Sequence, residues 1–132
     1  MIKMFIDGSA NPKKKISGVG ILLIESKEQI QISEKLDGVF DNHVAEILAL
    51  DYALDYLLKK KKENELIFCH SDSKMLVDAV EKRYSRKENH QIHLQTIFKQ
   101  LESFSQFYLK WIPEKDNSGA DHLARKGMNK KQ

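Results

Sequence analysis

The sequence of 132 residues lacks several features that would place it in particular classes of protein. It has a single cysteine, Cys69, so no disulfide can form within the chain and a reducing compartment is expected. No apolar run approaches the roughly 18 residues of a membrane-spanning helix, and no basic segment at the start leads into a hydrophobic one. We therefore expect a cytoplasmic protein with no membrane partner.

The chain also lacks a strong charge imbalance, internal repeats and low-complexity segments. Its 22 basic and 19 acidic residues give a formal net charge of +3, which permits a polyanionic partner without requiring one. The basic residues gather in four clusters, at 13–15, 59–62, 82–87 and 125–131. Such clusters are usually solvated helix ends or loops, but together they also favour phosphate contact. The length suits a single domain over residues 1–132.

Hydrophobic patterning predicts the order of the secondary-structure elements. Apolar or alternating runs indicate strands at 2–9, 18–24, 29–36, 66–71 and 107–112. Apolar residues at helical spacing indicate helices at 42–61, 74–80, 94–104 and from 117 onward, with Asn42 and Asn117 as N-caps. Three strands joined by short turns form an antiparallel meander. The βα units that follow predict an α/β fold, a five-stranded mixed sheet with helices on both faces.

Four acidic residues occupy positions suited to catalysis or metal binding: Asp7, Glu46, Asp72 and Asp121. Asp7 and Asp72 each follow an apolar strand, and side chains there project into the crevice where ligands of α/β folds collect. Glu46 lies near a predicted helix start, and Asp121 lies beside an apolar helical stripe. Structural explanations also exist. Asp7 can open a turn, Glu46 can interact with the helix dipole, and Asp116, a rival fourth ligand, suits a turn.

The predicted topology can bring these four carboxylates to one edge of the sheet. Converging carboxylates repel one another unless a cation is present, and all-oxygen ligands favour Mg²⁺ or Mn²⁺ over zinc. Two such ions roughly 3.5 to 4 Å apart form a clamp for in-line displacement at phosphorus. Acidic residues are abundant in this chain, so their spacing alone does not establish a metal site.

The sequences around these acids resemble type 1 ribonuclease H. The matching stretches, in the family's order, are Phe5–Ser9 with Asn11-Pro12, Gly18–Gly20, Asn42–Glu46, Ser71–Ser73, and Trp111–Pro113 leading to Ala120–Ala124. Each match is weak by itself, but the ordered set spans nearly the whole chain. The resemblance implies a ribonuclease H-like fold. It also implies a metal-dependent endonuclease that cuts the RNA strand of RNA/DNA hybrids, leaving 3′-hydroxyl and 5′-phosphate ends.

The resemblance assigns catalytic and metal-binding roles to all four acids. Asp7 would bridge two ions, Asp121 would hold the ion that activates water, and Glu46 and Asp72 would complete the second ion's site. Glu46 would also contact a ribose 2′-hydroxyl. Substrate contacts are implied at Gly8, Ser9, Asn11, Asn42, Ser73 and Lys74. The implied partner is an RNA/DNA hybrid; no obligate protein partner is evident, and we expect a monomer.

The sequence departs from the family pattern in two places. Segment 112–117 is too short for the histidine-bearing loop that often precedes the last helix, and it contains no histidine. Glu114 is a weak candidate replacement; His122 is not one, because adjacent helical positions point about 100° apart. Segment 82–89 is at most a remnant of the family's basic extension. A non-cleaving nucleic-acid-binding module, a nuclease with another substrate, and a small-molecule phosphotransfer or cation-binding protein therefore remain alternatives.

Several other chemically active side chains are expected to be structural. Cys69 lies in an apolar run typical of a core thiol. His70 is expected to pack on its strand, and His90 and His93 have no further ligands nearby in the sequence. Trp111 is expected to anchor the core because of its position on a strand.

Overall fold

The computed structural model describes residues 1–38 and 41–131. The strands are β1 (Ile2–Asn11), β2 (Ile16–Glu25), β3 (Glu28–Lys35), β4 (Leu66–Ser71) and β5 (Gln106–Trp111). The helices are α1 (Asn42–Lys59), α2 (Lys74–Lys82), α3 (Glu88–Leu101) and α4 (Ser118–Met128), with a short 3₁₀ turn η1 (Glu114–Asp116) before α4. Within the described ranges, no helix is both long and apolar enough to cross a membrane. The predicted domain, 1–132, also includes positions 39, 40 and 132, which lie outside the described residues.

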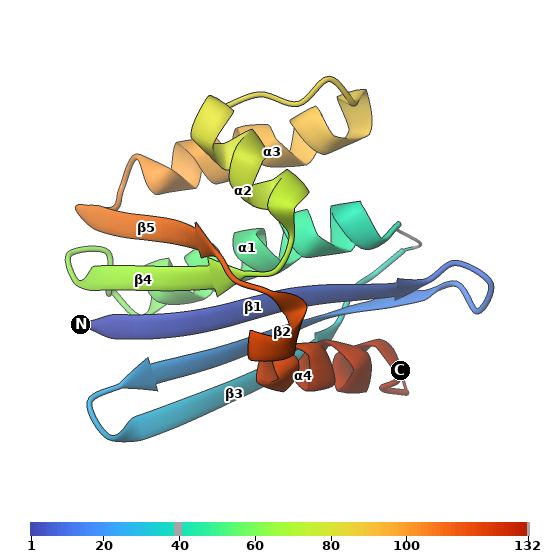
Figure 1. The fold of residues 1–132 in the computed structure, drawn as a ribbon, viewed down its shortest axis with the longest axis horizontal. Coiled ribbons are helices and arrows are strands. Elements are labelled where there is room, and N and C mark those ends of the chain that lie inside the picture. The colour runs from blue at the N-terminus through green and yellow to red at the C-terminus, as the bar shows by residue number, and fades with distance from the viewer. Residues whose placement is uncertain (39–40, 132) are drawn as a thin grey trace.

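The strands form one mixed sheet in the order β3-β2-β1-β4-β5 (Figure 1). Strands β1, β2 and β3 pair as an antiparallel meander, whereas β4 runs parallel to β1 and β5 runs parallel to β4. The predicted five-stranded mixed sheet is therefore confirmed. Strand β1 is central, and its ladder with β4 ends where Ile6 pairs with Ser71. The next residues along both strands, which include Asp7 and Asp72, thus emerge at the same edge.

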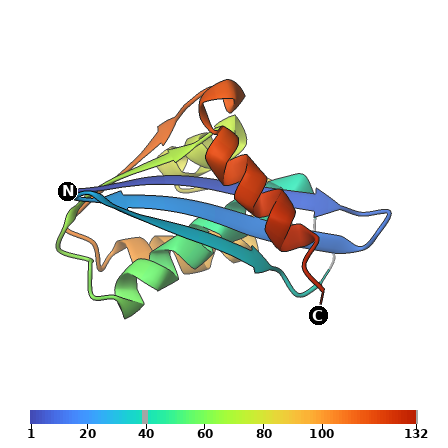
Figure 2. The same ribbon diagram turned by 90° about the horizontal axis from the view of Figure 1, so that it is seen from below.

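Helices cover both faces of the sheet, as predicted. Helix α1 packs on one face with α3 against it, while α4 crosses the opposite face over β1, β2 and β3 (Figure 2). Between α1 and the sheet lies a core of fully buried aliphatic side chains, among them Ile2, Met4, Ile6, Ile21, Ile47, Leu50, Leu54 and Ile67. Alternate residues of β1 supply this core because successive strand side chains point to opposite faces.

Glycines on the inner strands allow the helices to approach closely. A Cβ on Gly8 would lie 2.2 Å from the carbonyl carbon of Ala45 in α1, and one on Gly20 would lie 2.3 Å from the backbone nitrogen of Ala124 in α4. Both distances are far below van der Waals contact, so only glycine fits at these positions. These contacts hold α1 and α4 against the sheet on either side of Asp7.

Some sequence-based boundaries were wrong. The first strand was expected over residues 2–9, but β1 runs to Asn11 and pairs there with Ile16. Helix α1 is capped by Asp41 rather than Asn42, because the Asp41 carboxylate accepts a hydrogen bond of 2.7 Å from the Val44 amide. N-cap propensity does not distinguish Asp41 from Asn42, because both residue types are favoured at that position.

The prediction that Trp111 anchors the core was also wrong. Trp111 is 45% exposed at the end of β5, the outermost strand on its side of the sheet. The expected packing of His70 is confirmed, since its ring stacks on Phe5 with centroids 4.7 Å apart and its Nδ1 lies 2.8 Å from the Met4 carbonyl oxygen. Cys69 is buried in the core, as expected.

Candidate metal centre

Asp7 lies at the centre of the candidate site, on the middle strand of the sheet. Its side chain is only 7% exposed, and one carboxylate oxygen accepts a hydrogen bond of 3.0 Å from the Gly8 amide. Strand β1 continues past the end of its ladder with β4, so Asp7 stands where the neighbouring parallel strand has stopped. The backbone that carries this carboxylate is fixed by the ladder with β2, in which Asp7 pairs with Gly20.

Asp72 reaches the same edge from the end of β4. The turn that carries it is held by two serines: Ser71 Oγ accepts from the Ser73 amide at 3.0 Å, and Ser73 Oγ accepts from the Leu76 amide at 3.2 Å. The second bond caps α2, so the start of that helix and the position of Asp72 are fixed together.

Glu46 comes from the opening turns of α1, which Gly8 allows to lie directly on β1. Asp7, Glu46 and Asp72 each offer one carboxylate oxygen, and these three oxygens all lie within 4.8 Å of one another. This spacing suits ligands that share a cation. The donor set contains only oxygen, which fits Mg²⁺ or Mn²⁺.

Asp121, the fourth predicted ligand, lies beside this cluster on α4. Its charge and a side-chain hydrogen bond with Asp7 both raise the pKa of Asp7. Asp121 also pairs with Arg125 one helical turn later, with Nε 3.2 Å from the carboxylate oxygen. It is not part of the three-residue group whose oxygens lie within 4.8 Å of one another. The structure therefore brings three of the four predicted acids into one cluster and places the fourth next to it.

The electrostatics of the cluster favour binding of a cation. Burial, together with the charges of Asp72, Asp121 and Glu46, raises the pKa of Asp7 to about 8. Burial also raises the pKa of Glu46, although a hydrogen bond with Ser73 opposes this, and burial is the main cause that raises the pKa of Asp72. A divalent cation would offset the repulsion and allow all of these groups to ionise near neutral pH.

Asn117 is a site residue whose role the sequence did not reveal. It occupies the N-cap position of α4 as expected, but its side chain makes no capping hydrogen bond. Instead the buried amide, 1% exposed, donates to the Ile6 carbonyl at 2.9 Å, and a hydrogen bond from it lowers the pKa of Asp72. Asn117 thus ties α4, and with it Asp121, to the strand that carries Asp7. The sequence feature that could have indicated this role is the spacing, because Asn117 lies four residues, about one helical turn, before Asp121.

The predicted substrate-contact residues divide into two groups. Gly8, Ser73 and Lys74 lie within two residues of a clustered acid, and Asn42 lies about one helical turn before Glu46. Of these, Asn42 accepts a hydrogen bond of 3.0 Å from the Ala10 amide, which links the start of α1 to the end of β1.

Ser9 and Asn11 lie farther along β1, toward its hairpin with β2. The Ser9 hydroxyl contacts the sulfur of Met128 at 3.6 Å, and the Asn11 side chain accepts from the Lys14 amide at 3.2 Å within the turn. None of these contacts tests a role in substrate binding, so that role stays a prediction for all six residues.

The mixed sheet and the order of its strands form a ribonuclease H-like fold, with the clustered carboxylates beside its central strand. Residues 5–127 match the family model described as reverse transcriptase-like, and the chain belongs to this family. It is 32% identical over 131 residues to the Enterococcus faecalis protein named "Putative hydrolase EbsB", covering 98% of this chain and 96% of that protein.

Solved structures show the same fold. Ribonuclease H1 of Halobacterium salinarum superposes with a TM-score of 0.84 at 18% identity, with 97% of both chains covered. LC11 ribonuclease H1, isolated from compost by a metagenomic approach and solved in complex with an RNA/DNA hybrid, superposes with a TM-score of 0.81 at 22% identity. That match covers 98% of this chain and 97% of LC11. At these identities the likeness establishes the fold.

Proposed function

We propose that this protein is a metal-dependent endonuclease that hydrolyses the RNA strand of RNA/DNA hybrids and leaves 3′-hydroxyl and 5′-phosphate ends. The proposal rests mainly on the convergence of Asp7, Glu46 and Asp72, whose carboxylate oxygens lie within 4.8 Å of one another. A family relative is named as a hydrolase, and a structure of the same fold was solved with a hybrid bound. The first observation supports a hydrolytic reaction, and the second supports a nucleic-acid substrate.

The proposed ligands are Asp7, Glu46, Asp72 and Asp121, which would hold two Mg²⁺ or Mn²⁺ ions. Ions of this kind supply a water that is activated at neutral pH and positive charge at the leaving oxygen. The residues of the chain hold the ligands in place. The Gly8 amide orients Asp7, and the caps of α1 and α2 fix Glu46 and Asp72.

Substrate contact is proposed for the residues around this cluster. Glu46 would accept a hydrogen bond from a ribose 2′-hydroxyl, the group that distinguishes RNA from DNA. Asn42, Ser73 and Lys74, together with Gly8, Ser9 and Asn11 along β1, would contact the hybrid. The proposal further includes a single domain over residues 1–132 that acts as a cytoplasmic monomer.

A substrate panel tests the proposal. The protein is incubated with end-labelled RNA/DNA hybrid, duplex RNA or duplex DNA in Mg²⁺, in Mn²⁺ or in EDTA, and the products are separated on a denaturing gel. We expect cleavage of the RNA strand of the hybrid in at least one metal and none in EDTA. Cleavage of only duplex RNA or only duplex DNA would contradict the proposed substrate.

A second candidate function is a hybrid-binding module that does not cleave. It is favoured by the ion pair between Arg125 and Asp121, which occupies one proposed ligand, and by the absence of histidine from segment 112–117. This alternative predicts binding of the hybrid in a gel-shift assay with no product in Mg²⁺ or Mn²⁺.

A further inference from the structure

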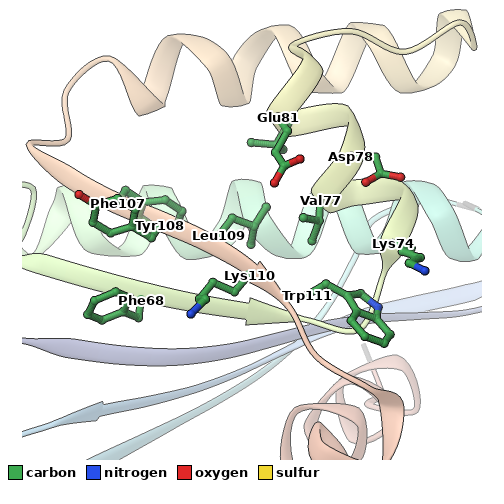
Figure 3. Close-up of a pocket in the computed structure, with 11 residues that line it drawn as sticks. Phe68, Lys74, Val77, Asp78, Glu81, Phe107, Tyr108, Leu109, Lys110 and Trp111 are labelled. Carbon is green, nitrogen blue, oxygen red and sulfur yellow. The ribbon is translucent and has the colours of Figure 1, made fainter.

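A groove of about 710 Å³ lies between α2 and β5, outside the acid cluster (Figure 3). Aromatic side chains and Lys110 line its β5 side, and α2 contributes acidic side chains and, at its first residue, Lys74. A cavity of this volume is in the range that accommodates a small organic ligand or a few ring systems.

One end of this groove begins at the candidate metal centre. The indole Nε1 of Trp111 donates a hydrogen bond of 3.2 Å to the carbonyl oxygen of Asp72. Lys74 follows Asp72 by two residues, and its ammonium nitrogen lies 5.3 Å from the centroid of the Trp111 ring. A polymer bound at the acid cluster therefore has a direct path into the groove.

Two of the aromatic side chains that line the groove are exposed to solvent. Trp111 and Tyr108 are 45% and 48% exposed, because β5 is the edge strand of the sheet. Tyr108 stacks on Phe68 of β4 with ring centroids 5.6 Å apart, which supports the ring from the sheet side. Exposed aromatic rings beside lysines are typical of surfaces on which the bases of a single strand stack.

The charges of the groove favour single-stranded nucleic acid over a duplex. Lys110 of β5 and Lys74, the first residue of α2, lie near the exposed rings, whereas Asp78 and Glu81 project from later positions of α2 (Figure 3). Phosphates are attracted to the lysine side and repelled from the acidic side. The acidic oxygens can accept hydrogen bonds from the N–H groups of bases. A duplex would bring a second phosphate backbone against Asp78 and Glu81, so a single strand fits the pattern better.

We propose that this groove binds an unpaired segment of nucleic acid that continues from the candidate active site, with its bases stacked on Trp111 and Tyr108. The identity of the duplex in the active site rests on the proposed function. Stacking in the groove does not depend on cleavage and is measured separately.

Trp111 is the only tryptophan in the chain, so its fluorescence reports directly on the groove. Titration of a short oligouridine in EDTA is expected to quench this fluorescence to saturation. Because stacking on one aromatic side chain contributes about 1–3 kcal/mol per base, Tyr108→Ala is expected to weaken the apparent affinity about fivefold or more. Tyr52→Ala, at an exposed tyrosine on α1, is the matched control and is expected to leave the affinity unchanged.

Charge variants test the lysine side of the groove. Lys110→Gln and Lys99→Gln each remove one positive charge from an exposed lysine, so they change the net charge equally. We expect Lys110→Gln to weaken oligouridine binding several-fold and to increase its salt sensitivity, and Lys99→Gln to leave both nearly unchanged. Equal effects of the two variants would show attraction to net charge alone and would overturn the proposal.

Hybrids with and without an overhang separate this inference from the proposed function. Fluorescence anisotropy in EDTA is expected to show tighter binding of a hybrid with an unpaired overhang than of a blunt hybrid. Tyr108→Ala is expected to remove that difference without changing the affinity for the blunt hybrid.

If no hybrid is cleaved but oligouridine still quenches Trp111, the proposed function fails and the groove assignment stands. If cleavage occurs but quenching is absent, the groove assignment is wrong. A fluorescence change that depends only on protein concentration would show a second copy in the groove and would also overturn the proposal.

Discussion

Gly8 of β1 lies against Ala45 of α1 so closely that a Cβ on the glycine would be 2.2 Å from the alanine carbonyl carbon and 2.5 Å from the Glu46 nitrogen. This contact joins the strand that carries Asp7 to the helix that carries Glu46. The separation of two proposed metal ligands is thus set by the absence of one methyl group.

Gly8→Ala is therefore expected to push α1 away from β1. Overpacking of this kind costs about 1–3 kcal/mol, and the displaced Glu46 should also weaken Mn²⁺ binding. Urea unfolding measures the first effect, and calorimetric titration of Mn²⁺ measures the second. Gly119→Ala is the control, because its Cβ would meet only the Leu22 side chain at 3.2 Å. If Gly8→Ala changed neither quantity, the close approach would not position the site.

The pKa of Asp7 predicts how the stability of the metal-free protein depends on pH. The pKa is 3.8 for the free side chain and about 8 in the folded protein, so the folded state binds more protons between these values. The free energy of unfolding should therefore fall as pH rises from about 4 to about 8. Stabilisation by Mg²⁺ should be larger at pH 8 than at pH 5, because the ligands must ionise to bind it.

Thermal unfolding in EDTA across this pH range tests the prediction, with Asp7→Asn as the comparison. The variant cannot lose a proton at this position, so its stability should decline less as pH rises. Parallel pH profiles for the two proteins would show that Asp7 does not carry the effect.

Asn117→Ala is expected to destabilise the protein and loosen α4. It leaves the buried Ile6 carbonyl without its side-chain partner, which costs about 1–3 kcal/mol. Asn129→Ala removes an exposed amide that donates to the Arg125 carbonyl, and it should change stability by less than about 0.5 kcal/mol. Chemical denaturation of both variants measures the difference. If the two variants were equally stable, the hydrogen bond from Asn117 to Ile6 would not stabilise the attachment of α4 to β1.

Arg125→Gln tests whether the arginine competes with a metal ion for Asp121. The ion pair is largely exposed, so its loss should change the free energy of unfolding by less than about 1 kcal/mol. Removal of the positive charge should lower the Mn²⁺ concentration needed for half-maximal cleavage. Lys126→Gln, which removes the neighbouring exposed charge, is the control. A higher metal requirement in Arg125→Gln would indicate that the arginine supports the site instead.

The order of the elements along the chain and the placement of Asp7 and Asp72 beside apolar runs could be predicted because both depend on local patterns. An apolar run followed by an acid is visible in the sequence, and the carboxyl ends of parallel strands lie at one edge of the sheet. The position of Trp111 could not be predicted, because an edge strand and a central strand carry similar residues. The role of Asn117 was also hidden, since an asparagine before a helix suggests a cap and its bond to Ile6 spans 111 positions.

The account depends most directly on Asp7. The decisive measurement is the single-turnover rate of RNA-strand cleavage in an RNA/DNA hybrid, in saturating Mg²⁺ or Mn²⁺, for the wild type, Asp7→Asn and Asp55→Asn. Asp55→Asn removes the same charge from a surface ion pair with Lys59. We predict that Asp7→Asn lowers the rate at least about a hundredfold while Asp55→Asn leaves it nearly unchanged. An Asp7→Asn protein that cleaves the hybrid at the wild-type rate would contradict the account.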